Sequence, residues 1–67
     1  MTIYSTKRCL ACNSLKAILI KKNIVFNNVF MEDILPHEQS KLKITSVPTI
    51  EFQGKRYRTL KEYNERN

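Results

Sequence analysis

Near its start the chain reads TIYSTKRCLAC over residues 2–12, in which Cys9 and Cys12 form a C-x-x-C motif. The first residues of this stretch, Thr2-Ile3-Tyr4, are β-branched and aromatic, and they predict a strand. From Cys9 to about Lys22 apolar residues recur at helical spacing, so the two cysteines lie one turn apart at a helix N-terminus. Unpaired backbone N–H groups and the positive end of the helix dipole favour a thiolate there. This arrangement predicts redox chemistry, with Cys9 as the nucleophile and Cys12 as the resolving thiol.

Two basic residues and two apolar residues surround the first cysteine. Lys7 and Arg8 add positive charge beside Cys9, which further favours the thiolate, although ordinary solubilising residues of a loop would look the same. Leu10 and Ala11 set the contact surface between the cysteines.

The segment after this helix predicts a strand that runs parallel to the first one. Asn23 is a plausible helix stop, and residues 24–30 (IVFNNVF) predict the second strand. The preceding helix is long enough to form a crossover, so we expect the two strands to be parallel neighbours. Pro36 then suits the first turn of a short helix that ends at Leu42 or Lys43.

The last third of the chain predicts a hairpin and a final helix. Residues 48–52 (PTIEF) and 56–58 (RYR) predict strands, joined by a tight turn at residues 53–55. Thr59-Leu60-Lys61-Glu62 has the T-x-x-E form of a capping box, so we expect a short helix to start at Leu60. The predicted order is β-α-β-α-β-β-α, which is an α/β fold in one domain covering residues 1–67.

Composition and charge limit the possible functions. With 42% hydrophobic residues in 67 the chain is expected to be globular, and we see neither a signal peptide nor a membrane span. Two cysteines without an export signal favour a redox pair in a reducing compartment over a structural disulfide. The net charge of +6 favours an acidic partner, while a solvated basic surface or nucleic-acid binding would also explain it. No nucleic-acid recognition motif accompanies the charge.

Two alternatives to redox chemistry would explain the cysteines: they could be a pair of small buried hydrophobic residues, or half of a zinc site. A structural zinc site needs about four protein ligands, and the chain offers the two cysteines and His37 without a second C-x-x-C. We therefore expect no metal, and we expect His37 to be an exposed residue in the first turn of the short helix.

Val47-Pro48 is the second informative element, because it joins a short loop to a strand. A proline at the first residue of a strand is usually trans, whereas a cis bond would turn the backbone of Val47 outward. Extended peptide or glutathione backbone could then pair with the N–H and C=O groups of Val47.

Taken together, these landmarks resemble those of the glutaredoxins, a family with the thioredoxin-like fold. The resemblance spans nearly the whole chain and rests on Tyr4-Ser5, Cys9-Leu10-Ala11-Cys12, Ser46-Val47-Pro48-Thr49 and the hairpin at Gly54, in that order. It implies a four-stranded mixed sheet, a cis Pro48 that faces Cys9, and glutathione or protein disulfides as substrates. The residues expected to bind substrate or glutathione are Tyr4, Lys7, Arg8, Leu10, Val47, Pro48, Arg58 and Thr59.

The chain departs from the glutaredoxin pattern at three places. Leu10-Ala11 stands where many members have Pro-Tyr, and Lys7 is shifted by one residue, with Thr6 at the expected basic position. Arg58-Thr59 replaces the glycine pair that helps to hold glutathione. Arg58 could pair with a glutathione carboxylate, or it could block the groove.

The sequence therefore predicts a cytoplasmic, monomeric thiol-disulfide oxidoreductase without a bound cofactor. Glutathione or a thioredoxin-reductase-like flavoenzyme would supply electrons. The resemblance extends to short phage-encoded glutaredoxins and to the glutaredoxin-like electron donors of ribonucleotide reductase, which makes that reductase a candidate partner. The alternative is a non-enzymatic thioredoxin-like binding module whose basic surface holds nucleic acid or an acidic protein.

Overall fold

The computed structural model describes residues 1–65, in which four strands and three α-helices alternate along the chain. The predicted order β-α-β-α-β-β-α is confirmed, with one additional 3-10 helix. The elements are β1 (Thr2–Ser5), α1 (Leu10–Lys21), β2 (Asn27–Phe30), η1 (Met31–Asp33), α2 (Pro36–Leu42), β3 (Thr49–Phe52), β4 (Lys55–Tyr57) and α3 (Leu60–Asn64).

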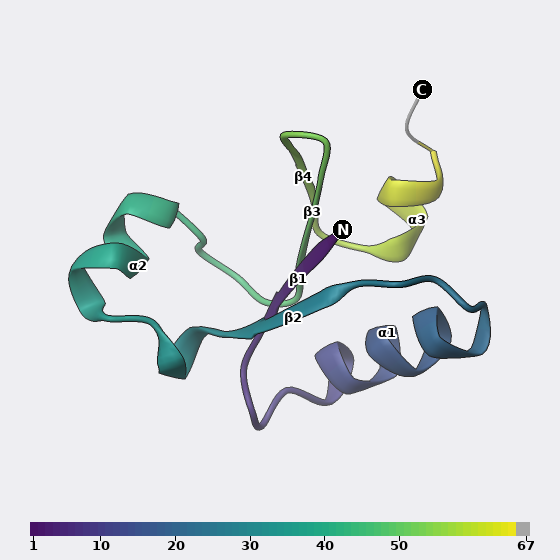
Figure 1. Ribbon diagram of the computed structural model, residues 1–67, viewed down its shortest axis with the longest axis horizontal. Helices are drawn as coiled ribbons and strands as arrows, with labels where there is room; N and C mark the ends of the chain where they lie inside the picture. Colours follow the sequence, from purple (N-terminus) through teal and green to yellow (C-terminus); the bar gives the residue numbers. More distant parts are fainter. Residues whose placement is uncertain (66–67) are drawn as a thin grey trace.

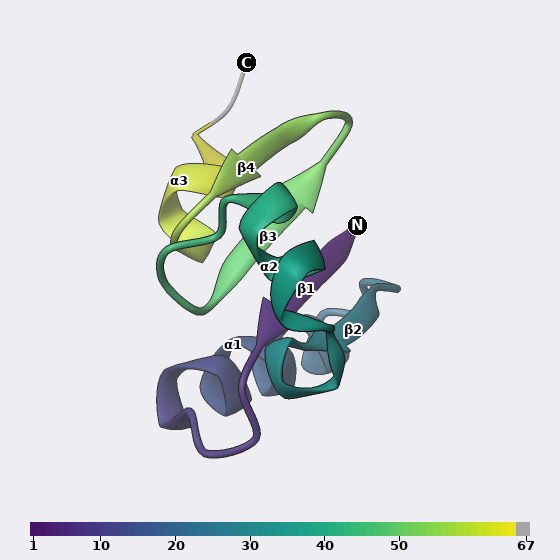
Figure 2. The same cartoon turned by 90° about the vertical axis from the view of Figure 1, so that its left-hand side faces the viewer.

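The strands form one mixed sheet in the order β2-β1-β3-β4. β1 and β2 are parallel, as predicted, with Thr2 opposite Asn27. β3 is antiparallel to both β1 and β4, so the predicted C-terminal hairpin is also confirmed. Helices α1 and α3 lie on one face of the sheet and α2 lies on the other (Figures 1 and 2). The structure is thus a three-layer α/β arrangement.

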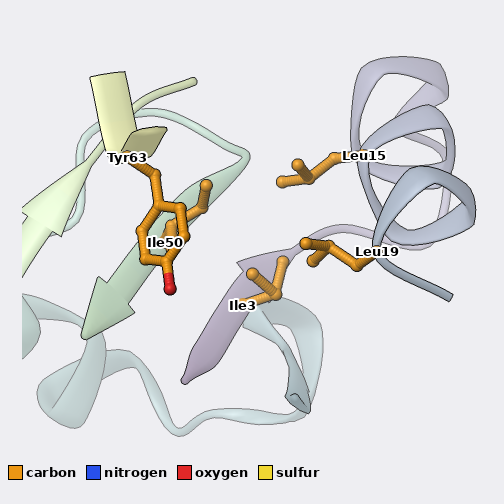
Figure 3. Packing of buried hydrophobic residues seen from close by; sticks show 5 residues of the cluster. All are labelled: Ile3, Leu15, Leu19, Ile50 and Tyr63. Atoms are coloured by element: carbon orange, nitrogen blue, oxygen red, sulfur yellow. The ribbon is translucent and has the colours of Figure 1, made fainter. Parts of the chain in front are cut away.

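The core lies between the sheet and the helices α1 and α3. Ile3 of β1, Leu19 of α1 and Ile50 of β3 are fully buried, and their side chains meet as Figure 3 shows. Leu15 and Tyr63 extend this cluster towards α3. Because helix α1 presents its buried residues at helical spacing, the apolar stripe of the sequence determines which side of the helix faces the sheet.

The second strand begins later than its sequence indicates, and the end of α1 gives the reason. Asn23 has a left-handed backbone (φ 59°), which ends the helix as predicted. Ile24 N–H donates to the Leu19 carbonyl at 2.9 Å, so Ile24 belongs to the helix terminus and not to the sheet. Val25 is 90% exposed. The prediction of a strand from residue 24 is therefore wrong, and β2 begins at Asn27.

The hairpin strand β4 is shifted by one residue from the predicted range 56–58, because Arg58 belongs to the cap of the last helix. Arg58 N–H donates to the Glu62 carboxylate at 2.9 Å, and Glu62 N–H donates to the Thr59 hydroxyl at 3.1 Å. The second bond is the expected N-cap contact at Thr59, whereas the Glu62 carboxylate binds the N–H of Arg58 and not that of Thr59. Helix α3 starts at Leu60 as predicted.

Candidate active site

The cysteine pair lies at the N-terminus of α1, where it forms a disulfide. Cys9 is the N-cap residue and has an extended backbone, while Cys12 lies in the first turn. Cys12 N–H donates to the Cys9 sulfur at 3.1 Å, and this first turn carries no acidic side chain. The amide group and the helix dipole therefore stabilise negative charge on the Cys9 sulfur.

The two cysteine residues differ in their exposure to solvent. Cys12 is fully buried, whereas Cys9 is only partly buried. An incoming substrate can therefore reach Cys9 more readily than Cys12, which fits a nucleophile followed by a resolving thiol. Between the two, Leu10 is 83% exposed and projects an apolar side chain at the tip of the motif.

The loop that leads to Cys9 is tied to the segment after β2. Lys7 N–H donates to the Glu32 carboxylate at 2.8 Å, and Lys7 Nζ lies 3.5 Å from Asp33 Oδ1. The same ammonium lies 5.7 Å from the centre of the Phe30 ring. Lys7 thus fixes the loop, while Arg8 is exposed beside Cys9. The two basic residues that the sequence places together have different surroundings.

We expect the bond between Lys7 and Glu32 to weaken in acid. The hydrogen bond from the Lys7 backbone lowers the pKa of the Glu32 carboxyl below its ordinary value. A lowered folded-state pKa gives a stabilisation that is present above the ordinary pKa and is lost as the pH falls through the lowered one. The Lys7 amide proton shift, followed by NMR, should titrate with a midpoint below the ordinary glutamate value. Glu32→Gln is the control, because it keeps a hydrogen-bond acceptor and removes the titrating carboxyl group. A Lys7 amide proton shift that does not change as the pH falls would contradict this contact.

The Val47–Pro48 peptide bond is cis, as the resemblance implied. Pro48 borders an open groove with a volume of about 310 Å³ that also reaches the first turn of α1. We call it the apolar groove, and its lining residues are Ala11, Ser14, Leu15, Ile18, Pro48, Arg58, Thr59 and Leu60. The structure thereby brings together Pro48, Arg58 and Thr59, three of the residues predicted to bind substrate.

Tyr4 is not among the residues around this groove. It lines a different cavity, between the sheet and α2, together with Val29, Ile34 and Leu42. Burial, and then the nearby Glu51 carboxylate, raise the pKa of the Tyr4 hydroxyl above its ordinary value. Since β1 buries Ile3 against α1, alternation along the strand turns Tyr4 to the opposite face.

Five lining residues of the apolar groove were not predicted as site residues: Ala11, Ser14, Leu15, Ile18 and Leu60. Ile18 is one of the apolar residues that recur at helical spacing in α1, yet it is 41% exposed. The sequence carries no local signal that separates Ile18 from the buried Leu15 and Leu19, because all three share the helical spacing of the apolar residues.

Among residues 1–65, no group of three or more His, Cys, Asp or Glu side chains is placed to hold a metal ion. His37 is exposed. Within the same residues, every helix is too short or too polar to span a lipid bilayer. Comparison of the chain with protein-family models, with curated proteins and with solved structures finds no match. The site itself therefore carries the functional assignment.

Proposed function

We propose that this protein is a glutaredoxin-like thiol-disulfide oxidoreductase. The observation that carries the proposal is the Cys9–Cys12 disulfide at the start of α1, in which Cys9 is partly exposed and Cys12 is fully buried. The cis Val47–Pro48 bond and the groove beside it support a substrate platform next to this pair. The sheet order, with two parallel strands and an antiparallel hairpin, supports a thioredoxin-like fold.

The reaction begins with the reduced pair. The Cys9 thiolate attacks one sulfur of a substrate disulfide, whose S–S bond breaks, and the other substrate sulfur leaves as a thiolate that takes a proton from water. The Cys12 thiol then loses its proton to solvent, and its sulfur attacks the Cys9 sulfur. The bond between Cys9 and the substrate breaks, and the Cys9–Cys12 disulfide forms. The substrate gains two electrons and the cysteine pair loses two.

A second thiol reaction returns the pair to its reduced form. Glutathione would supply two electrons from two thiols, and a thioredoxin-reductase-like flavoenzyme would supply them from its own dithiol. As electron acceptor we propose a protein disulfide, such as that of a ribonucleotide reductase, on the strength of the family resemblance.

The test of the proposed function is a single-turnover reaction that needs no natural reductant. Protein reduced with dithiothreitol and then freed of it is mixed with a peptide disulfide, and the released peptide thiol is measured over time. We expect each protein molecule to reduce one peptide disulfide, which releases two peptide thiols, with the Cys9–Cys12 disulfide as the other product. Release no faster than with free dithiothreitol at equal thiol concentration would overturn the proposal.

We expect glutathione to serve as a reductant, but more weakly than a glycine pair at positions 58 and 59 would allow. Both residues line the apolar groove, and their side chains occupy space that glycine leaves open. Arg58 can pair with a glutathione carboxylate, and added salt screens such an exposed pair. Glutathione-dependent turnover of the wild type should therefore fall at high salt.

The matched variant is Arg58→Gly/Thr59→Gly. Its turnover should depend less on salt, because the cation is gone. Glycine at the N-cap costs only a few tenths of a kcal/mol, so α3 should persist. A wild type that is fast, saturable and insensitive to salt, with no change on the double substitution, would show that these two residues do not govern glutathione use.

A further inference from the structure

Two cavities border the chain around Pro48, and Arg58 lines both of them. One is the apolar groove. The other, which we call the basic cavity, has a volume of about 180 Å³ and lies between the loop after α2 and strand β4. Its lining residues are Lys43, Ile44, Thr45, Ser46, Thr49, Arg56, Tyr57 and Arg58. A substrate that lies along the loop at residues 45–48 would therefore meet both cavities.

The three cations of the basic cavity are not equivalent. Arg56 already donates to the Leu42 carbonyl, and its Nε lies 3.5 Å from the Glu51 carboxylate. Lys43 and Arg58 form no ion pair with any residue in the described part of the chain, 1–65. The Glu62 carboxylate accepts a hydrogen bond from the backbone N–H of Arg58 and not from its guanidinium group. Two exposed positive charges thus remain available to an acidic ligand.

The apolar groove and the basic cavity together form one candidate binding surface, and the apolar groove is its mainly apolar part. Its walls are apolar side chains from α1 and from the start of α3, namely Leu15, Ile18 and Leu60, together with Pro48. No acidic side chain from residues 1–65 lines either cavity. A ligand that fits both would combine at least one carboxylate with an apolar side chain, a combination found in a peptide segment.

We propose that this surface selects an extended acidic segment of a disulfide-bearing protein. A carboxylate of the segment lies at Lys43 and Arg58, an apolar side chain enters the apolar groove, and the substrate disulfide lies at Cys9. The inference rests on the proposed oxidoreductase function and adds to it the class of substrate. The positive charges favour an acidic segment over a neutral or basic one, because complementary charges attract. The apolar groove favours a protein ligand over a nucleic acid.

The test compares three peptide disulfides in the single-turnover reaction: one with glutamates and a leucine near the cysteine, one with lysines in place of the glutamates, and one with glycine in place of the leucine. We expect the acidic leucine peptide to react about three- to tenfold faster than the lysine peptide at low salt, the range that one or two exposed ion pairs supply. Its advantage over the glycine peptide should be of similar size, because the glycine peptide has no apolar side chain to bury in the apolar groove. High salt should remove the advantage over the lysine peptide and leave the advantage over the glycine peptide.

Three variants locate the effect. Lys43→Ala/Arg58→Ala should lower the ratio of the rate with the acidic leucine peptide to the rate with the lysine peptide. Ile18→Ser should lower the ratio of the rate with the acidic leucine peptide to the rate with the glycine peptide. Lys22→Ala, at the far end of α1, should change neither ratio. Equal rates for all three peptides would overturn the substrate class and leave the oxidoreductase in place. Failure to reduce any of them would overturn both. Inhibition by a short DNA oligonucleotide, without any preference among the peptides, would assign the basic cavity to nucleic acid and overturn the inference.

Discussion

Replacing Cys9 by serine should abolish thiol-disulfide exchange, whereas replacing Cys12 by serine should preserve the first attack and stop the reaction at a mixed disulfide. Cys9 is the N-cap residue of α1 and receives the Cys12 N–H at 3.1 Å, so its thiolate is stabilised and partly accessible. Cys12 is fully buried and can attack only the sulfur beside it. The measurement is mass spectrometry of the reaction with a peptide disulfide, which should show an adduct for Cys12→Ser and none for Cys9→Ser.

The rate of alkylation distinguishes the two thiols in the reduced wild type. Iodoacetamide at neutral pH should modify Cys9 well before Cys12, because the thiolate is the reactive form and burial protects the second sulfur. Lys21→Ala, a change at an exposed residue in the last turn of the same helix, is the control for any general effect of substitution in α1. Equal alkylation of both cysteines, or an adduct that forms on Cys9→Ser at the wild-type rate, would reverse the assignment.

Leu19→Ala should remove most of the stability of the fold. Leu19 is fully buried between the sheet and α1, and truncation of a buried leucine to alanine costs about 2–5 kcal/mol. A chain of this length is expected to have a free energy of unfolding of about 3–10 kcal/mol, so the loss is a large part of the total. Urea unfolding followed by circular dichroism should show a much lower midpoint, or a chain that is already partly unfolded in water.

The neighbouring Ile20 provides the matched control, since it is 66% exposed on the same helix. Ile20→Ala should change the free energy of unfolding by no more than about 0.5 kcal/mol, as surface substitutions usually do. Both variants are compared in the oxidised form so that the disulfide constrains the unfolded chain equally. Similar losses for the two variants would mean that α1 does not pack on the sheet through Leu19.

The order of the elements was predictable because each one carries a local signal. Alternation of hydrophobic residues, the proline at the start of α2 and the T-x-x-E cap of α3 all act within a few residues of one another. The start of β2 was not predictable in this way. Residues 24–26 have the composition of a strand, but the left-handed turn at Asn23 takes Ile24 into the end of α1. A side-chain pattern does not reveal that competition for backbone hydrogen bonds.

The candidate site likewise has one part that local sequence signals predict and one part that they do not. The cysteine pair and its asymmetry follow from spacing at a helix N-terminus, which is local information. The apolar groove depends on how closely α3 approaches α1, which is a tertiary property, so Ile18 and Leu60 could not be recognised as lining residues. Tyr4 illustrates the reverse case: its position next to the motif in sequence does not bring it to the groove, because β1 turns it to the face covered by α2.

The short helix α3 forms one wall of the apolar groove, and a single buried side chain, Tyr63, anchors it. The Tyr63 ring meets Phe52 and Tyr57 edge to face, with centroid distances of 5.5 and 5.7 Å. The opposite wall belongs to α1, which also carries the cysteines. One wall of the apolar groove therefore lies on the helix that carries the cysteines, and the other wall lies on a separate segment of the chain. Under the proposed function, we expect changes between residues 58 and 64 to alter which substrates the protein accepts and to leave the N-terminus of α1 at Cys9 unchanged.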